Sequence, residues 1–207
     1  MKDALIIFAK NPERGKVKTR LAATIGKDAA LSVYQRLLSH TASITKFILV
    51  DKFVFYSDNI LQQDVWCNDL FFKQTQEGND LGERMKNAFA AIFRKDYSKI
   101  IIIGTDCPDL NADVITHAFK CLDSHDVVIG PAHDGGYYLL GIKQLCSQLF
   151  QNIRWSTHTV FEDTRMKCEH LNLNYSLLPT LRDLDLEEDL KYFKTENNDQ
   201  HHYPDVQ

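Results

Sequence analysis

Short runs of consecutive aliphatic and β-branched residues recur along the chain, and they restrict its fold more than any other feature. The clearest run is residues 100–103, four isoleucines in a row, and residues 4–9, 53–56 and 126–130 are of the same kind. Continuous apolar runs, rather than strict alternation, are typical of strands in a parallel sheet that is covered on both faces. The runs therefore predict a sheet buried between two layers of helices.

Segments with an apolar period of 3.6 residues lie between these runs. The four predicted helical faces carry Leu31, Tyr34, Leu37, Leu38 and Thr41; Leu81, Met85, Ala88, Phe89 and Ile92; Val114, Ala118, Cys121 and Leu122; and, more weakly, Val160, Thr164 and Leu171. Asp80 precedes the second face and Glu83 follows three residues later, an acidic variant of the capping box. Strands that alternate with helices in this way indicate βαβ units with right-handed crossovers.

A fifth apolar run, residues 136–142, follows the fourth after a turn too short for a parallel crossover. We therefore expect it to be antiparallel, which makes the sheet mixed. A sixth strand is predicted at residues 175–178. No linker or repeat interrupts the pattern, so we predict one α/β domain over residues 1–194 and a flexible polar tail over residues 195–207. Two histidines of that tail, His201 and His202, we expect to be solvated.

Composition excludes several classes of protein. The 207 residues include 24 basic and 28 acidic side chains, a formal charge of -4, and no basic stripe, which disfavours a nucleic-acid binder. No apolar run approaches the roughly 18 residues of a membrane span, and no signal peptide is recognisable. Five cysteines without a CxxC pair are typical of reduced thiols in the cytoplasm, so we expect a cytoplasmic protein.

The segment after the first predicted strand, residues 10–21, is rich in cations. Its Lys10, Gly15, Lys16, Lys18 and Arg20 combine positive charge with backbone freedom, which suits a polyphosphate. The GxxxxGK[ST] pattern of a Walker A loop is absent. A solvated basic loop is the alternative, but ligands of open parallel sheets bind where such loops gather, at the carboxyl ends of strands.

Carboxylates follow two other strands. Asp106 comes just after the isoleucine run, and one or two carboxylates together with substrate phosphates are the usual ligands of Mg²⁺. We therefore predict that Asp106 holds a divalent cation, Mg²⁺ or Mn²⁺, with Asp183 as a candidate second ligand. Two further aspartates, Asp109 and Asp185, we expect to cap the helices that follow them.

Residues 133–136, His-Asp-Gly-Gly, follow the fourth strand. Asp134 can ligate the metal, orient an acceptor hydroxyl or act as a base, and His133 can act as a base. The paired glycines Gly135 and Gly136 let the backbone approach a ligand, although a tight structural turn explains them equally well.

Two more segments are candidates for substrate binding. Gly82 and Arg84 lie in the first turn of a predicted helix, where free N–H groups favour anions and where a glycine suggests a close approach to the backbone. Trp155, Ser156 and Thr157 precede another predicted helix; they form either a cap with an aromatic anchor or part of a pocket wall.

Six motifs in order resemble a bacterial family of the nucleotide-diphospho-sugar transferase superfamily, the radical-SAM/selenodomain-associated or arsenosugar-biosynthesis glycosyltransferase-like transferases. They cover residues 4–190 and comprise 8–10 with 15–21, 80–85, 104–108, 130–138, 155–157 and 182–185. The resemblance implies a GT-A-like three-layer fold, phosphate contacts from Lys16, Lys18 and Arg20, and metal binding at Asp106. A DxD pair is absent, since Cys107 and Pro108 follow Asp106.

Three functions are compatible with these residues. The first is transfer of a glycosyl group from a nucleoside-diphosphate sugar to a small acceptor, with Asp134 acting on the acceptor. The second is nucleotidyl transfer from an NTP to a phosphorylated small molecule. The third is a nucleotide-binding module without turnover. The absence of a GxSxG elbow and of HExxH leaves hydrolase and zincin functions without support.

Overall fold

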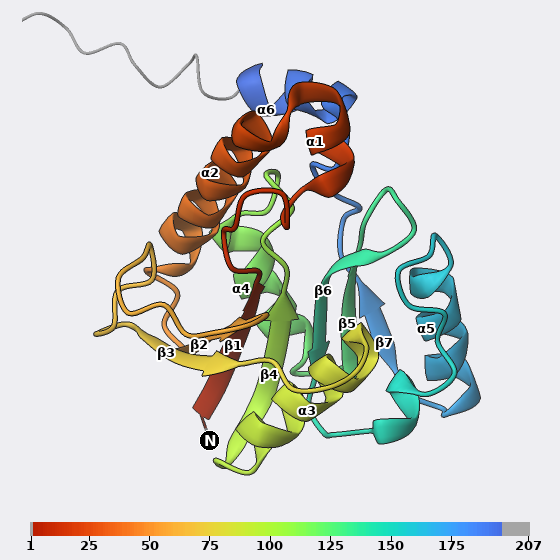
Figure 1. Ribbon diagram of the computed structural model, residues 1–207. Coiled ribbons are helices and arrows are strands. Elements are labelled where there is room, and N and C mark those ends of the chain that lie inside the picture. The colour runs from red at the N-terminus through yellow and green to blue at the C-terminus, as the bar shows by residue number, and fades with distance from the viewer. Residues whose placement is uncertain (1, 196–207) are drawn as a thin grey trace, which may run out of the picture.

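The computed structural model describes residues 2–195. A seven-stranded sheet runs through the middle of the molecule, with helices around it (Figure 1). The elements, in chain order, are β1 (Lys2–Ala9), α1 (Thr19–Ile25), α2 (Lys27–Thr45), β2 (Asp51–Tyr56), β3 (Phe71–Thr75), α3 (Leu81–Phe93), β4 (Tyr97–Ile103), α4 (Ala112–Cys121), β5 (Val127–Pro131), β6 (Tyr137–Ile142), the 3₁₀ turn η1 (Ser147–Phe150), α5 (Val160–His170), β7 (Tyr175–Leu177), the 3₁₀ turn η2 (Glu187–Asp189) and α6 (Leu190–Thr195).

The strand order is β3-β2-β1-β4-β6-β5-β7. All neighbouring strands are parallel except for β6, which pairs antiparallel with both β4 and β5. The predicted mixed, mostly parallel sheet and the reversed strand at 136–142 are thus confirmed. The edge strand β3 was not predicted, because only two apolar residues, Phe71 and Phe72, precede three polar ones. Residues 10–21 were predicted to be a loop, whereas helix α1 begins at Thr19.

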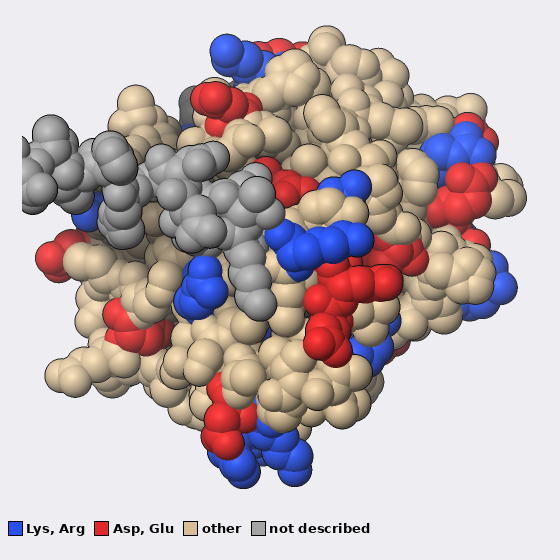
Figure 2. All heavy atoms as spheres, turned by 90° about the horizontal axis from the view of Figure 1, so that it is seen from above, with Lys and Arg blue, Asp and Glu red and all other residues tan. Residues whose placement is uncertain are grey.

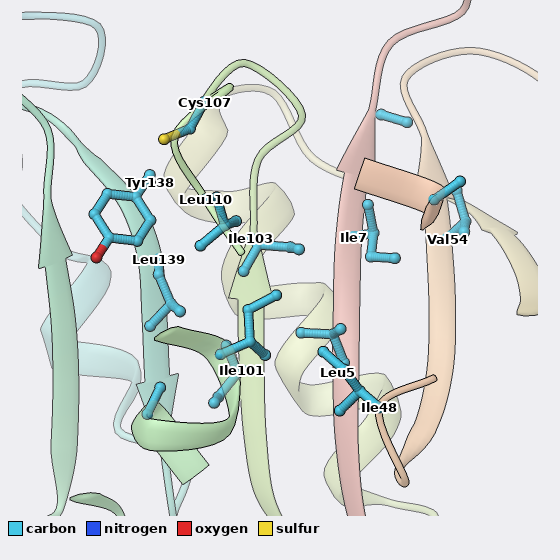
Figure 3. Packing of buried hydrophobic residues seen from close by; sticks show 14 of the residues in the cluster. Leu5, Ile7, Ile48, Val54, Ile101, Ile103, Cys107, Leu110, Tyr138 and Leu139 are labelled. Atoms are coloured by element: carbon cyan, nitrogen blue, oxygen red, sulfur yellow. The ribbon is translucent and has the colours of Figure 1, made fainter. Parts of the chain in front are cut away.

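Two layers of side chains sandwich the sheet. On one face, Leu5 and Ile7 of β1 and Ile101 and Ile103 of β4 pack with residues of α2 and α4 (Figure 3). Cys107 lies at one end of this cluster, beside Tyr138. On the other face, side chains of α3, η1 and α5 cover the intervening residues of the same strands. The fold is therefore the predicted three-layer sandwich. Because side chains alternate between the two faces of a strand, the central strands β1 and β4 carry apolar residues on both sides.

A smaller apolar cluster joins three helices above the sheet. Leu21 of α1 and Leu37 of α2 pack with Leu184 and with Phe193 of α6. The guanidinium of Arg36 lies over the Phe193 ring, with 4.4 Å between them. This packing brings the end of the described chain onto α1 and α2 and so fixes the segment around residue 184, which contributes to the site.

The helix caps agree only in part with expectation. Asp80 caps α3 as predicted, accepting a hydrogen bond of 2.8 Å from the backbone N–H of Glu83. The prediction for Asp109 is wrong: Asn111 caps α4, because α4 begins two residues later than the sequence suggested. Asp185 is likewise no cap, since Asp189 accepts the backbone N–H groups of residues 185 and 186.

Among residues 2–195, no helix combines the length and hydropathy that crossing a bilayer demands. The predicted polar tail, with His201 and His202, lies outside the described residues except for Thr195.

Candidate functional site

A cleft lies over the carboxyl ends of β1 and β4. It consists of two adjoining hollows of about 460 and 730 Å³. Both are lined by Lys10, Tyr34, Leu81, Asp106, Tyr137 and Asp183. Seen from above, basic and acidic side chains lie next to one another on this face of the molecule (Figure 2). The cleft is where ligands bind in open parallel sheets.

The first hollow lies between the ends of β1 and β2 and the start of α3. Ser57, Gln76 and Arg84 contribute to its wall. The Arg84 guanidinium donates a hydrogen bond of 3.1 Å to the carbonyl of Gly78. Neither this guanidinium nor the ammonium of Lys10 forms an ion pair within residues 2–195. Positive charge at this end of the cleft is therefore available to a ligand.

The cationic side chains of the loop after β1 differ in whether they reach the cleft. Lys16 pairs with Glu13 at 2.6 Å in solvent and lines neither hollow, and Gly15 packs against the side chain of Lys27. Lys18, in contrast, has a left-handed backbone (φ 47°, ψ 47°) at the start of α1 and lines the second hollow. Of the predicted phosphate-binding residues in this loop, the structure brings Lys10, Lys18 and Arg20 to the cleft and leaves Lys16 and Gly15 outside it.

The Lys18 side chain is 3% exposed and lies between two carboxylates. Its ammonium is 2.7 Å from Oδ1 of Asp106 and 3.1 Å from Oδ1 of Asp185, and Arg20 binds the other oxygen of Asp185 at 2.5 Å. Burial disfavours charge on Lys18, but the two carboxylates outweigh it and raise the pKa of Lys18 above its ordinary value. Lys18 thus remains charged, and its ion pairs bring the loops after β1, β4 and β7 together.

Tyr34 of α2 connects the loop after β1 with the loop after β4. Its hydroxyl accepts a hydrogen bond from the Lys10 N–H at 2.8 Å, approaches the Lys10 carbonyl at 3.1 Å, and lies 3.2 Å from the hydroxyl of Thr105. Burial, reinforced by the charge of Asp106, raises the pKa of Tyr34. The sequence placed Tyr34 in an apolar helical face and did not identify it as a site residue. The sequence offered one hint: a tyrosine hydroxyl on a helical face that is buried needs a hydrogen-bond partner.

Negative charge crowds the middle of the cleft. Burial, together with the charges of Asp106 and Asp134, raises the pKa of Asp183 to about 7 against the opposing effect of Lys18. The Asp183 carboxylate forms no hydrogen bond within the described chain. The backbone N–H of Leu184 donates to the carbonyl of Asp106 at 2.8 Å, which keeps the predicted pair of metal ligands, Asp106 and Asp183, on adjoining loops.

The donor set fits a divalent cation only in combination with a ligand. Within residues 2–195, no three His, Cys, Asp or Glu side chains are arranged to hold a metal ion. Two carboxylates lining both hollows are nevertheless present, and one of them is destabilised by neighbouring negative charge. Mg²⁺ is commonly held by one or two carboxylates and completed by substrate phosphates and water. Asp106 and Asp183 match that arrangement.

The turn between β5 and β6 directs Asp134 and not His133 toward the cleft. Asp134 lines the second hollow, and its Oδ1 accepts the N–H of Gly136 at 2.8 Å. His133 is exposed and lines neither hollow. Gly135 has φ +88°, and a Cβ there would lie 1.9 Å from the carbonyl oxygen of His158. Gly135 therefore serves a close contact between two loops of the protein, and His158, which sequence reasoning missed, joins the wall of the second hollow.

The segment 155–157 packs on the start of α3. A Cβ on Gly82 would lie 2.2 Å from Nε1 of Trp155, so the close approach suggested by this glycine is made by an indole ring. Ser156, whose φ is +62°, lines both hollows, and Thr157 lines the second. A positive φ in a non-glycine residue is costly and often marks a functional site. The cap of α5 falls on Thr159, so Ser156 and Thr157 form pocket wall rather than helix cap, while Trp155 packs on α3 and lines neither hollow.

Sheet order and cleft together define the nucleotide-diphospho-sugar transferase and cytidylyltransferase type of α/β fold. The chain belongs to the family described as "Uncharacterized protein conserved in bacteria (DUF2064)", whose model matches residues 41–157. Comparison with curated proteins yields no match.

Solved structures show the same fold. One is from Desulfovibrio desulfuricans G20 and is described, provisionally, as a nucleotide-diphospho-sugar transferase: it is 31% identical, the match covers 97% of this chain and 90% of that one, and the TM-score is 0.89. A 4-diphosphocytidyl-2C-methyl-D-erythritol synthase from Anaerococcus prevotii DSM 20548 is 9% identical over 95% and 96% of the chains, with a TM-score of 0.61. At such low identity the second likeness concerns the fold alone.

Proposed function

We propose that the protein transfers a glycosyl group from a nucleoside-diphosphate sugar to a small acceptor. The observation that carries this proposal is the charge arrangement of the cleft, in which Lys10 and Arg84 without ion pairs face the carboxylates Asp106 and Asp183. The first hollow suits a diphosphate, since fixed cations stabilise the charge that develops on a leaving phosphate. The 31% identical structure described as a nucleotide-diphospho-sugar transferase supports the same class.

Each residue has a role in this proposal. Lys10 and Arg84 bind the diphosphate, and Lys18 positions the loops of Asp106 and Asp185 through its two ion pairs. Asp106 and Asp183 would hold a divalent cation, Mg²⁺ or Mn²⁺, which supplies Lewis-acid stabilisation of the departing diphosphate when bound. Asp134 orients the acceptor hydroxyl and takes its proton, a contribution of about 10²–10⁴-fold for a positioned base.

Bond changes balance without a further reactant. The acceptor oxygen forms a bond to the anomeric carbon of the donor, the bond from that carbon to the diphosphate oxygen breaks, and its electron pair leaves with the diphosphate. The acceptor proton passes to the Asp134 carboxylate and then to solvent. The narrower assignment to the arsenosugar-biosynthesis branch stays a prediction.

Nucleotidyl transfer is the second candidate, because Lys10 and Arg84 suit the polyphosphate of an NTP equally well. The two reactions differ in their leaving group. A panel of NDP-sugars and NTPs, each with Mg²⁺ or Mn²⁺ and with small acceptors, distinguishes them: release of NDP supports glycosyl transfer, whereas release of pyrophosphate supports nucleotidyl transfer. Nucleotide binding without either product would indicate a binding module, and absence of NDP-sugar binding at millimolar concentration would refute the proposal.

A further inference from the structure

The two hollows of the cleft differ in the charge they offer to a ligand. Lys10 lines both hollows and Arg84 only the first, and neither forms an ion pair within residues 2–195. In the second hollow the additional cations are Lys18 and Arg20, and both are paired. The difference bears on the acceptor, because the proposed function places the donor diphosphate in the first hollow, and Asp134, which acts on the acceptor hydroxyl, lines the second.

Asp185 neutralises two cations of the second hollow, Lys18 and Arg20. Its two oxygens bind Lys18 at 3.1 Å and Arg20 at 2.5 Å, and Asp106 binds Lys18 as well at 2.7 Å. Asp185 is itself held by the turn that Asp189 closes through the backbone N–H groups of residues 185 and 186. A phosphate entering this hollow would therefore have to compete with a carboxylate that is already in place.

After this pairing, Lys10 is the one cation of the second hollow without an ion pair within residues 2–195, and it is outnumbered by two carboxylates that also form none. Asp134 is exposed to the hollow and forms no ion pair within the described residues, and Asp183 adds a second carboxylate. An anionic acceptor would meet like charge at short range in a partly desolvated cleft, where such repulsion is far stronger than in water. The polar but uncharged groups of the wall, Thr19, Thr157 and Ser156, can exchange hydrogen bonds with hydroxyl groups instead.

We propose that the second hollow binds an uncharged, hydroxyl-rich acceptor, a sugar or polyol, and discriminates against its phosphorylated counterpart. This inference rests on the proposed function and narrows it, since it names the acceptor class. Asp134 contributes by accepting a hydroxyl hydrogen bond and by repelling a phosphate. Asp185 contributes by keeping Lys18 and Arg20 occupied. It is a specificity-determining residue that acts through those two cations.

The test compares matched pairs of acceptors that differ only in one phosphate, such as glucose with glucose 6-phosphate and glycerol with glycerol 3-phosphate. NDP release from the donor panel gives kcat/KM for each acceptor, and ligand-observed NMR gives its affinity both without and with NDP and Mg²⁺. We expect the neutral member to be preferred by at least tenfold in kcat/KM. Preference for the phosphorylated member, or binding of neither member under either condition, overturns the inference.

Two variants test which residues cause the preference for a neutral acceptor. Asp185→Asn should free Lys18 and Arg20 and raise affinity for the phosphorylated acceptors at least fivefold, in a manner that salt suppresses. Asp134→Asn should lower kcat with every acceptor and narrow the difference in affinity between the neutral and phosphorylated members, because the charge that repels phosphate is lost. Asp113→Asn, exposed on α4 and remote from the cleft, is the matched control and should change neither. Unchanged acceptor preference in Asp185→Asn contradicts the assigned role of Asp185.

The failure of this inference is distinguishable from failure of the proposed function. NDP-sugar binding by thermal shift reports on the donor hollow alone. If donors bind and phosphorylated acceptors are preferred, glycosyl transfer survives and the acceptor class is wrong. If no NDP-sugar binds, the proposed function fails, and acceptor binding to the nucleotide-free protein still decides the charge preference of the second hollow.

Discussion

The ammonium of Lys18 lies 2.7 Å from the carboxylate of Asp106 although the two residues belong to loops after different strands. Lys18 is 3% exposed in its side chain, whereas Asp106 is 42% exposed. The pair thus joins a buried cation to a carboxylate that still faces the cleft. It ties the loop that is predicted to bind phosphate to the predicted metal ligand, and several expectations follow from it.

Replacing Lys18 should destabilise the protein. Lys18→Met leaves Asp106 and Asp185 crowded without their shared cation, and we expect a loss of about 1–3 kcal/mol in the free energy of unfolding. Lys16→Met removes an exposed ion pair with Glu13 from the same loop, and such pairs contribute only about 0–1 kcal/mol. Urea denaturation of both variants checks the difference. Equal losses would show that the Lys18 pairs have no special structural role.

Asp183 should make stability depend on pH. Because its pKa is raised from 3.8 to about 7 in the folded protein, folding binds a proton that the unfolded chain releases, and stability falls as pH rises between these values. Asp183→Asn removes this penalty, which is at most about 4 kcal/mol at 1.36 kcal/mol for each pH unit.

Thermal denaturation of Asp183→Asn and of the unmodified protein should therefore diverge with pH. We expect the variant to gain in Tm relative to the unmodified protein as pH rises from 5 to 8. Asp113→Asn on the surface of α4 is the control and should show no such trend. A constant difference across this range would mean that Asp183 ionises without a penalty.

Gly82→Ala should be destabilising even though alanine is the better helix former by about 1 kcal/mol. The added Cβ would meet the Trp155 ring at 2.2 Å, and overpacking of this kind costs about 1–3 kcal/mol. A double-mutant cycle with Trp155→Ala isolates the contact. In the Trp155→Ala background, Gly82→Ala should become neutral or stabilising, and persistence of the full loss would contradict the packing role of this glycine.

Arg84→Ala should weaken binding of nucleoside diphosphates. Hydrogen bonds to charged groups contribute about 1.5–3 kcal/mol, which corresponds to a loss in affinity of roughly tenfold to a hundredfold. Lys86→Ala removes a cation from the same helix without altering the cleft, and it is the matched control. Isothermal titration with UDP and CDP in the presence of Mg²⁺ measures both. Equal affinities in the two variants would remove Arg84 from the proposed diphosphate site.

Some features of the site were readable from the chain because they depend on local chemistry. Asp80 and Glu83 predict the start of α3, and the polar residues after the isoleucine run indicate the carboxyl end of β4. Asp109 and Asp185 were misread because a carboxylate before a helical segment resembles a cap, and only three-dimensional distances reveal which polar group reaches the free N–H. Tyr34 and His158 carried no motif at all.

By itself, the sequence determined the layered α/β architecture, the reversed strand at β6 and the edge of the sheet where polar residues gather, because burial imposes its period on every strand and helix. Only the tertiary structure decided which cations remain available. Lys16 and Lys18 are two residues apart and chemically alike, yet one pairs with Glu13 in solvent and the other lies buried between Asp106 and Asp185. Charge pairing depends on distances across separate loops, and those distances arise only when β1, β4 and the segment after β7 come together in one sheet.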